Sequence, residues 1–196
     1  AVEEVDVNRA FWRGKRVLVT GHTGFKCGWL ALWLAEMGAE VHGYALQPPT
    51  TPSLFEVARV GQRLASSTIA DVRDAAALAQ AVRAARPGIV LHLAAQPLVR
   101  QSYREPVETF ATNVMGSVHL LEAVRGIDGV RAVVMTGQGR IFSAGVDLMR
   151  LTAGGAHYVR KFLPALHKLY DTVFHHPKPV IAAVNGHAIA GGCVLQ

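Results

Sequence analysis

The stretch that decides the fold reads Arg16-Val-Leu-Val-Thr20-Gly-His-Thr-Gly-Phe-Lys-Cys-Gly28. Its first five residues form a short run rich in β-branched side chains, which is typical of a buried parallel strand. Glycines follow at 21, 24 and 28, and a helical pattern then runs to Gly38. Glycines between a strand and a helix let backbone N–H groups approach a pyrophosphate at the helix N-terminus. The stretch therefore predicts a dinucleotide phosphate loop, and the alternative is a structural turn without a ligand.

Strands and helices alternate along the rest of the chain, as expected of a parallel sheet covered on both faces. We expect strands at 16–20, 40–46, 67–70, 89–94, 130–135 and 180–184, and helices at 29–37, 74–86, 105–125 and 155–175. Pro164 predicts a kink or a break in the last helix. The predicted fold class is α/β: a single doubly wound, Rossmann-like parallel sheet with strand order 3-2-1-4-5-6 and helices on both faces.

Composition limits the possible functions. The chain has 196 residues, 51% apolar and 17% charged, which is typical of one globular domain. No apolar run is long enough to span a bilayer, so no membrane partner is expected. Lysines and arginines give a net charge of +6 but are scattered, so no nucleic-acid partner is expected. The histidines show no metal-ligand spacing, and two cysteines without an export signal favour a reducing cytoplasm.

Cys27 departs from the glycine pattern. A Gly-x-x-Gly-x-x-Gly spacing places the third glycine at 27, where it would allow close packing of helix on strand, and Gly28 compensates in part. A thiol at a helix N-terminus is expected to have a lowered pKa and raised reactivity. The alternative is that Cys27 fills a small gap. No acidic residue that could bind the adenosine ribose ends the second strand at 43–47. The residues alone therefore do not decide whether the cofactor is NAD or NADP.

From residue 11 to about 125 the chain resembles the extended short-chain dehydrogenase/reductase family, and within it the CDP-glucose 4,6-dehydratases. The motifs that carry the resemblance are Thr20-Gly-His-Thr-Gly-Phe-Lys26, Pro48-Pro-Thr-Thr-Pro-Ser-Leu-Phe55, Asp71-Val-Arg-Asp74, Leu91-His-Leu-Ala-Ala-Gln-Pro-Leu-Val99, Ser102-Tyr-Arg-Glu-Pro106 and Thr112-Asn-Val-Met-Gly116. The resemblance implies an NAD cofactor. The cofactor-binding residues that it implies are Gly21, Thr23, Gly24, Phe25, Lys26, Asp71, Val72, Leu93, Ala94, Ala95 and Asn113. Among them, Asp71 and Val72 would meet the adenine, and Asn113 would be the structural asparagine below the active site.

The catalytic groups of that family are not matched. The resemblance implies a Thr/Ser-Asp-Lys set after the fifth strand and a Tyr-x-x-x-Lys pair. Thr136 aligns with the Thr/Ser of this set as a vestigial catalytic residue, but no Asp-Lys follows it. Tyr158 and Lys161 are three positions apart instead of four, and no other tyrosine has a lysine four residues later.

From about residue 129 the chain resembles a second family, the enoyl-CoA hydratase/isomerase or crotonase group. The motifs are Val130-Arg-Ala-Val-Val-Met-Thr-Gly-Gln-Gly-Arg-Ile-Phe-Ser-Ala-Gly-Val-Asp-Leu148 and Pro177-Lys-Pro-Val-Ile-Ala-Ala-Val-Asn-Gly-His-Ala-Ile-Ala-Gly-Gly-Cys193. By motif position, Val146 and Gly191 would be the backbone donors of an oxyanion hole. One acid/base glutamate of that family would fall at Val194 and the other beyond Gln196.

Two families in one chain predict a chimera, engineered or recombined, whose join is expected near 125–129. We expect a tail at 1–10, a dinucleotide-binding half at 11–128, and a crotonase-like β-α-β segment at 129–196 that completes the same domain. The expected function is a catalytically inactive protein with residual NAD binding. The alternatives are an active NAD-dependent sugar-nucleotide 4,6-dehydratase, a CoA-thioester hydratase, or a structural chimera without a ligand. Apolar surfaces left by missing parts of each family favour self-association.

Overall fold

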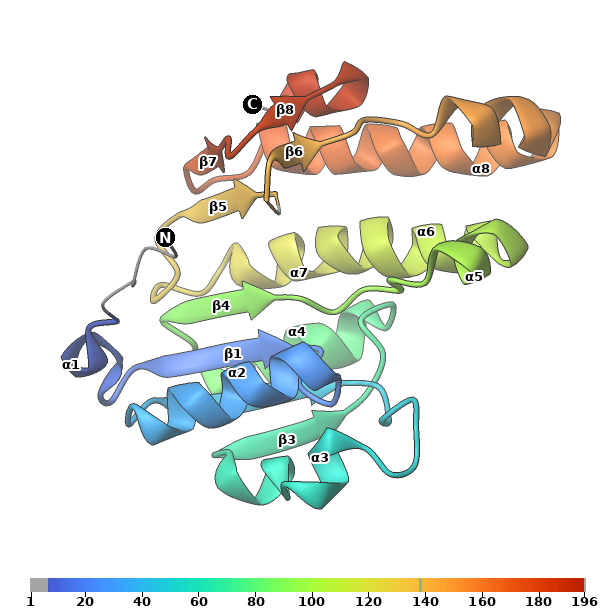
Figure 1. The fold of residues 1–196 in the computed structure, drawn as a ribbon. Helices are drawn as coiled ribbons and strands as arrows, with labels where there is room; N and C mark the ends of the chain where they lie inside the picture. Colours follow the sequence, from blue (N-terminus) through green and yellow to red (C-terminus); the bar gives the residue numbers. More distant parts are fainter. Residues whose placement is uncertain (1–6, 138, 196) are drawn as a thin grey trace. The chain divides into compact units, whose positions relative to one another are not determined.

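The computed structural model describes residues 7–137 and 139–195 and divides them into two compact units (Figure 1). Unit 1 is the chain up to Ala95 together with Gly126–Val130. Unit 2 is Gln96–Arg125 together with the chain from Arg131 onward. Residues 1–6 of the predicted tail lie outside the described residues, and the short helix α1 (Arg9–Trp12) follows them.

Unit 1 is built on a four-stranded parallel sheet. Its strands are β1 (Arg16–Thr20), β2 (Glu40–Ala45), β3 (Ser66–Ile69) and β4 (Ile89–His92). Their order is β3-β2-β1-β4, with Val17 of β1 paired to Val41 on one side and Ile89 on the other. This confirms the first four strands of the predicted order. The central position of β1 places its carboxyl end, where the glycine loop begins, between two neighbouring strands.

Helices cover both faces of this sheet. Figure 1 shows α2 (Phe25–Glu36) in front of the sheet and α4 (Ala75–Ala85) behind it. Apolar residues of α2 and of the central strands form the core, among them Val17, Val19, Ala31, Leu34 and Val41. The short helices α3 (Leu54–Val57) and η1 (Val60–Arg63) lie between β2 and β3, where no helix was predicted. A capping box between Ser53 and Glu56 starts α3.

Helices make up most of unit 2. The predicted helix at 105–125 is α6 (Pro106–Phe110), a π-helical turn η2 (Ala111–Met115) and α7 (Gly116–Val124), preceded by α5 (Val99–Arg104). Further along the chain lie α8 (Leu148–Phe174) and the 3₁₀ segment η3 (Ala190–Leu195).

The strands of unit 2 correct the prediction of a single six-stranded sheet. β5 (Val133–Thr136) pairs in parallel with β7 (Val180–Ala183), as expected of the fifth and sixth strands, but the two form a separate two-stranded sheet. The side chains of Val134 and Ile181 are 62% and 51% exposed. A strand in the middle of a doubly wound sheet is buried on both faces, and these two are not. A second pair, β6 (Ile141–Ser143) with β8 (His187–Ala188), was not predicted.

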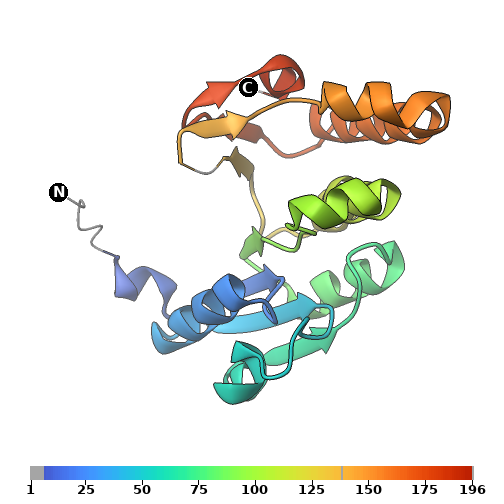
Figure 2. The same cartoon turned by 45° about the vertical axis from the view of Figure 1, so that its right-hand side comes forward.

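The break in α8 lies at Gly155 and not at Pro164. Gly155 has φ 58° and ψ −164°, a conformation that only glycine adopts readily. The chain changes direction there (Figures 1 and 2), whereas Pro164 lies within the following helical stretch. In the described part of the chain, none of the helices is long and apolar enough to cross a lipid bilayer.

Candidate functional site

The first candidate site is the turn after β1. Gly21 has φ +85°, and its N–H donates to the Tyr44 carbonyl of β2 over 2.9 Å. A Cβ at Gly21 would lie 3.1 Å from the Ala94 nitrogen and 3.2 Å from its Cα. Glycine is therefore required both by the left-handed backbone and by the close approach of the chain after β4.

Thr20 ties the two strand ends together. Its fully buried hydroxyl accepts hydrogen bonds from the N–H groups of Leu93 and Ala94, each over 3.1 Å. The same oxygen lies 2.8 Å from Nδ1 of His92, whose pKa is lowered by burial. The structure thus brings two predicted cofactor residues, Leu93 and Ala94, beside the glycine turn. Ala95 follows them and is exposed.

The N-terminus of α2 opens directly from this turn. Gly24 is its N-cap, and no side chain caps the helix. The first N–H groups of a helix have no intrahelical partners and carry a partial positive charge, which suits a phosphate. Phe25 and Lys26 are exposed in this first turn, whereas Thr23 is buried and donates to the Leu46 carbonyl over 2.8 Å. Thr23 therefore holds the loop against the end of β2.

Cys27 lies in the apolar core and not at the mouth of the loop. Its side chain is 8% exposed and belongs to the cluster that contains Val17, Val19 and Ala31. Burial raises the pKa of the thiol, against the smaller effect of the nearby Lys26 charge. The predicted lowering of the pKa is therefore wrong, because desolvation of the thiolate outweighs the charges at the helix end. The structure favours the alternative that Cys27 fills a gap.

His22 is a residue of this loop that the sequence reasoning missed. Its imidazole is fully buried, Nε2 lies 2.8 Å from the Ser67 hydroxyl, and the ring meets Phe55 edge to face. A Cβ at Gly43 would overlap the ring, so a glycine in β2 makes its space. Burial lowers the pKa of His22 to about 4, and the backbone of Tyr44 opposes this shift weakly. Gly43 inside a buried strand was the signal that could have found the contact.

Asp71 and Val72 follow β3. The Asp71 carboxylate accepts from the backbone N–H of Arg73 and from its guanidinium, with Oδ2 at 2.6 Å from Nη2, and these bonds hold the pKa of the carboxyl below its usual range. The Tyr44 hydroxyl donates to the Asp71 carbonyl over 2.9 Å. Because the Tyr44 carbonyl also receives the Gly21 N–H, one residue of β2 links the predicted adenine and phosphate ends. Val72 is buried.

Asn113 acts on the backbone. In the π-helical turn of unit 2 its carboxamide accepts from the Gln96 N–H over 2.7 Å and donates to the Gln96 carbonyl over 3.1 Å. The Gln96 side chain donates in turn to the Thr109 hydroxyl over 3.0 Å. These contacts fit the structural role implied for Asn113.

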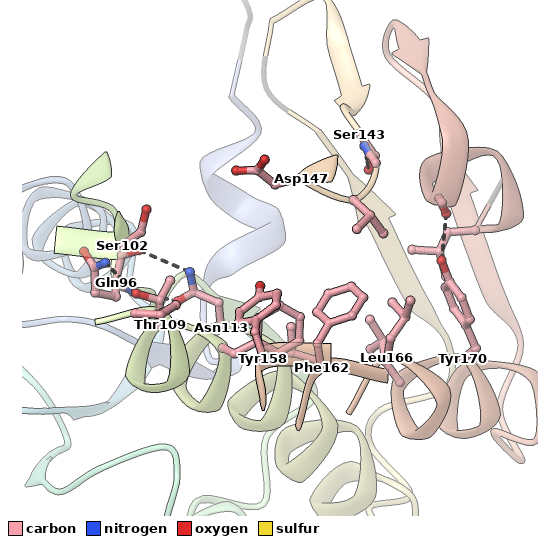
Figure 3. Close-up of a pocket in the computed structure, with 18 of the residues that line it drawn as sticks. Gln96, Ser102, Thr109, Asn113, Ser143, Asp147, Tyr158, Phe162, Leu166 and Tyr170 are labelled. Carbon is pink, nitrogen blue, oxygen red and sulfur yellow. Dashed lines mark hydrogen bonds between the residues drawn. The ribbon is translucent and has the colours of Figure 1, made fainter. Parts of the chain in front are cut away.

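The second candidate site is a pocket of about 410 Å³ in unit 2 (Figure 3). Val146 and Gly191, the predicted oxyanion-hole donors, meet in its wall: a Cβ at Gly191 would lie 3.4 Å from Cγ2 and 3.9 Å from the nitrogen of Val146. The Tyr170 hydroxyl donates to the Gly191 carbonyl over 3.2 Å and so holds that segment on α8. The structure thus brings two residues 45 positions apart to one place.

An aromatic cluster lines the same pocket. Tyr158 and Phe162 of α8 stack at 5.6 Å, and Phe110 of α6 meets Phe162 edge to face at 4.8 Å. Figure 3 shows Tyr158 and Phe162 between the polar side chains Gln96 and Asn113 on one side and Tyr170 on the other. The pocket therefore combines an apolar middle with hydrogen-bonding groups at both ends.

Thr136 does not line either site. Its hydroxyl donates to the Ala183 carbonyl of β7 over 3.1 Å and so joins the two strands. His176 is buried, and its Nε2 lies 3.2 Å from the Leu121 carbonyl in α7. Among the residues that the structure describes, no group of three or more histidine, cysteine or acidic side chains could hold a metal ion.

Comparison with known families divides the chain. Residues 18–142 match the family described as GDP-mannose 4,6 dehydratase, and residues 99–196 match the enoyl-CoA hydratase/isomerase family. CDP-glucose 4,6-dehydratase of Salmonella typhimurium is 57% identical over 128 residues, which are 65% of this chain and 35% of that protein. A Thermus thermophilus protein that carries the name enoyl-CoA hydratase is 45% identical over 85 residues, which are 40% of this chain and 34% of that protein. The chain spans about a third of the length of these relatives.

Solved structures show the same fold. UDP-glucose 4-epimerase of Thermotoga maritima, with UDP-glucose, matches with a TM-score of 0.57 and 22% identity over 85% of this chain and 53% of its own. The corresponding epimerase of Bifidobacterium longum, in complex with NAD⁺ and UDP, gives a TM-score of 0.58 at 20% identity over 85% and 51%.

Proposed function

The chain belongs to the GDP-mannose 4,6 dehydratase family over residues 18–142 and to the enoyl-CoA hydratase/isomerase family over residues 99–196; we propose that it is an engineered or recombined chimera that binds NAD at its glycine loop without turning over a sugar nucleotide. One observation carries this proposal. The Gly21 turn and the uncapped N-terminus of α2 open together at the carboxyl end of the central strand β1. This is the place where open parallel sheets bind ligands.

The residues present fit a dinucleotide. Gly21 and Gly24 leave the loop backbone uncovered, and a Cβ at Gly24 would come within 3.3 Å of the Gly21 carbonyl. Cys27 does not fill the loop, because its side chain is buried in the core. The α2 N-terminus would hold the pyrophosphate, and Asp71 and Val72 would meet the adenine. The complexes of related epimerases with NAD support this assignment.

Bound NAD would supply a hydride acceptor. Oxidation of a sugar alcohol also needs a base that removes the hydroxyl proton, and the family uses the tyrosine of Tyr-x-x-x-Lys. This spacing does not occur in the sequence. Tyr158 lies instead in an aromatic stack with Phe162. We therefore expect cofactor binding without hydride transfer.

Isothermal titration calorimetry with NAD tests the proposal. The parent should bind saturably with one site, and Gly24→Ala should weaken binding about tenfold or more, which equals about 1.4 kcal/mol. Gly126→Ala is the matched control, because a Cβ there meets nothing within 4 Å and it should leave the affinity unchanged. Absence of NAD binding by a folded parent would refute the proposal and leave a structural chimera. Formation of the dehydrated 4-keto-6-deoxy sugar nucleotide from CDP-glucose would refute the lack of turnover, because the hydride returns to the sugar in that reaction and no NADH accumulates.

A second candidate function concerns the pocket of unit 2. The proximity of Val146 and Gly191 in the pocket wall supports binding of a thioester carbonyl, because a pair of backbone N–H donors aimed at one carbonyl oxygen would stabilise the charge that it gains. The acid/base glutamate that the family would place at 194 is a valine here. We therefore expect binding of an acyl-CoA without hydration. Gly191→Val should abolish saturable binding of crotonyl-CoA, and Gly126→Ala should not.

A further inference from the structure

An aromatic stripe runs along the outer face of α2. Phe25, Trp29 and Trp33, here called the α2 stripe, are 71%, 55% and 50% exposed. They are spaced four residues apart, so at 3.6 residues per turn they lie along one side of the helix. The side chains of Cys27, Ala31 and Leu34 face the sheet and are buried. The stripe therefore lies opposite the buried face, and Figure 1 shows α2 in front of the sheet.

Single exposed apolar residues are common, but an aligned set of three aromatics is typical of an interaction surface. The charges around the stripe are opposite at its two ends. Lys26 lies in the first turn of α2, and Glu36 lies in the last turn, 3.6 Å from the Arg63 guanidinium. This distribution is complementary to itself when the helix is reversed.

We propose that the α2 stripe binds the same surface of a second copy of this chain, with the two α2 helices antiparallel about a twofold axis. An axis near residue 31 sets Trp29 of one copy against Trp33 of the other. It also sets Lys26 beside the Glu36 of the second copy, on both sides of the axis. Such an isologous contact closes at two copies and leaves no stripe exposed.

The area of the stripe predicts the strength of this dimer. Aromatic side chains present about 150–250 Å² each, so their exposed fractions amount to roughly 350 Å² per copy and roughly 700 Å² in total. Stable interfaces bury about 1,200–2,000 Å², and smaller ones are weak and transient. We therefore expect a dissociation constant on the order of tens of micromolar.

Sedimentation equilibrium without NAD tests the proposal, so its outcome is independent of cofactor binding. The weight-average mass of the parent should rise from 21.0 kDa towards twice that value as the concentration passes from about 1 to 200 µM. The double variant Trp29→Gln/Trp33→Gln should stay monomeric over this range. Val57→Gln is the matched control, because Val57 is 74% exposed on α3 of the same unit but lies outside the stripe. This variant should dimerise as the parent does.

Two further readouts separate this surface from others. Emission of the stripe tryptophans should shift to the blue with rising concentration in the parent. Glu36→Lys should weaken dimerisation severalfold, and adding Lys26→Glu should restore it in part, because the swapped pair meets again across the axis. Far-UV circular dichroism checks that every variant folds. A parent that stays monomeric at 200 µM, or tryptophan variants that still dimerise, would overturn the proposal.

Discussion

The burial of Cys27 has a direct consequence for binding. The thiol occupies the position that a glycine spacing reserves for close helix–strand packing, and the core accepts it beside Val17 and Val19. The phosphate loop and the thiol are therefore separate features of the same helix turn.

We predict that Cys27→Gly destabilises the protein and leaves NAD affinity within about twofold. A helical glycine costs about 1 kcal/mol relative to alanine, and the lost side chain leaves a cavity, so we expect about 1–3 kcal/mol in total. Urea denaturation and calorimetry measure the two effects. Cys27→Ala keeps the helix propensity and isolates the cavity. A gain of tenfold or more in NAD affinity on Cys27→Gly would show that the thiol obstructs the loop.

His22 predicts a dependence of stability on pH. Its pKa is about 4 in the folded protein against 6.5 for the free side chain. The unfolded chain therefore binds more protons between these values, so the free energy of unfolding rises with pH from about 4 to 6.5 and falls on acidification through that range. The difference between these two pKa values limits this contribution to about 3 kcal/mol.

The slope of the unfolding free energy between pH 4 and 6.5 measures this contribution. His22→Gln should have a shallower slope than the parent, whatever its absolute stability. His42 and His92 also have pKa values lowered by burial, and they titrate in both proteins, so the difference in slope isolates His22. Equal slopes would contradict the prediction.

At the scale of elements, the sequence pattern predicted the strands and helices whose formation depends on neighbouring residues. β1 is a run rich in β-branched residues that ends at the glycine turn, and its parallel order with β2, β3 and β4 follows from the helices between the strands. β6 and β8 are three and two residues long and pair across a register shift, so neither carries a periodicity to detect. His22 was missed for a similar reason, since its burial depends on Gly43, which lies 21 residues away. The positions of Val146 and Gly191 came from family motifs, and the pattern of residues alone did not indicate them.

The helix α8 is interrupted by the non-helical backbone conformation of Gly155, whereas Pro164 lies within a continuous helical stretch. Gly155→Ala should destabilise the protein by about 1–3 kcal/mol, because a side chain is strained at φ 58° and ψ −164°. Urea denaturation followed by far-UV circular dichroism measures the change. Gly126→Ala serves as the control, since its backbone is unstrained and its surroundings are open. An effect of Gly155→Ala no larger than that of the control would mean that the chain does not need this turn.

At the scale of the molecule, the two units carry different reporters. All three tryptophans, Trp12, Trp29 and Trp33, lie in unit 1. Tryptophan emission therefore follows unfolding of the dinucleotide-binding unit, whereas far-UV circular dichroism follows both units.

We predict that these two signals give different midpoints in urea, because two compact units need not unfold in one step. NAD at about one hundred times its dissociation constant should stabilise unit 1 by about 2.7 kcal/mol and shift the fluorescence midpoint. The part of the dichroism change that belongs to unit 2 should stay in place. Coincident transitions that move together with NAD would contradict this independence.

The segment Gly126–Val130 bears on how a chain that matches two families can arise. It lies inside the overlap of the two family matches, residues 99–142, and it belongs to unit 1, where Val130 is buried and a Cβ at Gly129 would come within 2.7 Å of the Pro87 carbonyl. The overlap of the two family matches thus includes residues in the interior of a folded unit. A protein cut at residue 95 would lack Gly126–Val130, which belong to the same compact unit as the sheet. A chimeric origin of this chain would therefore require a joint inside a single folded unit.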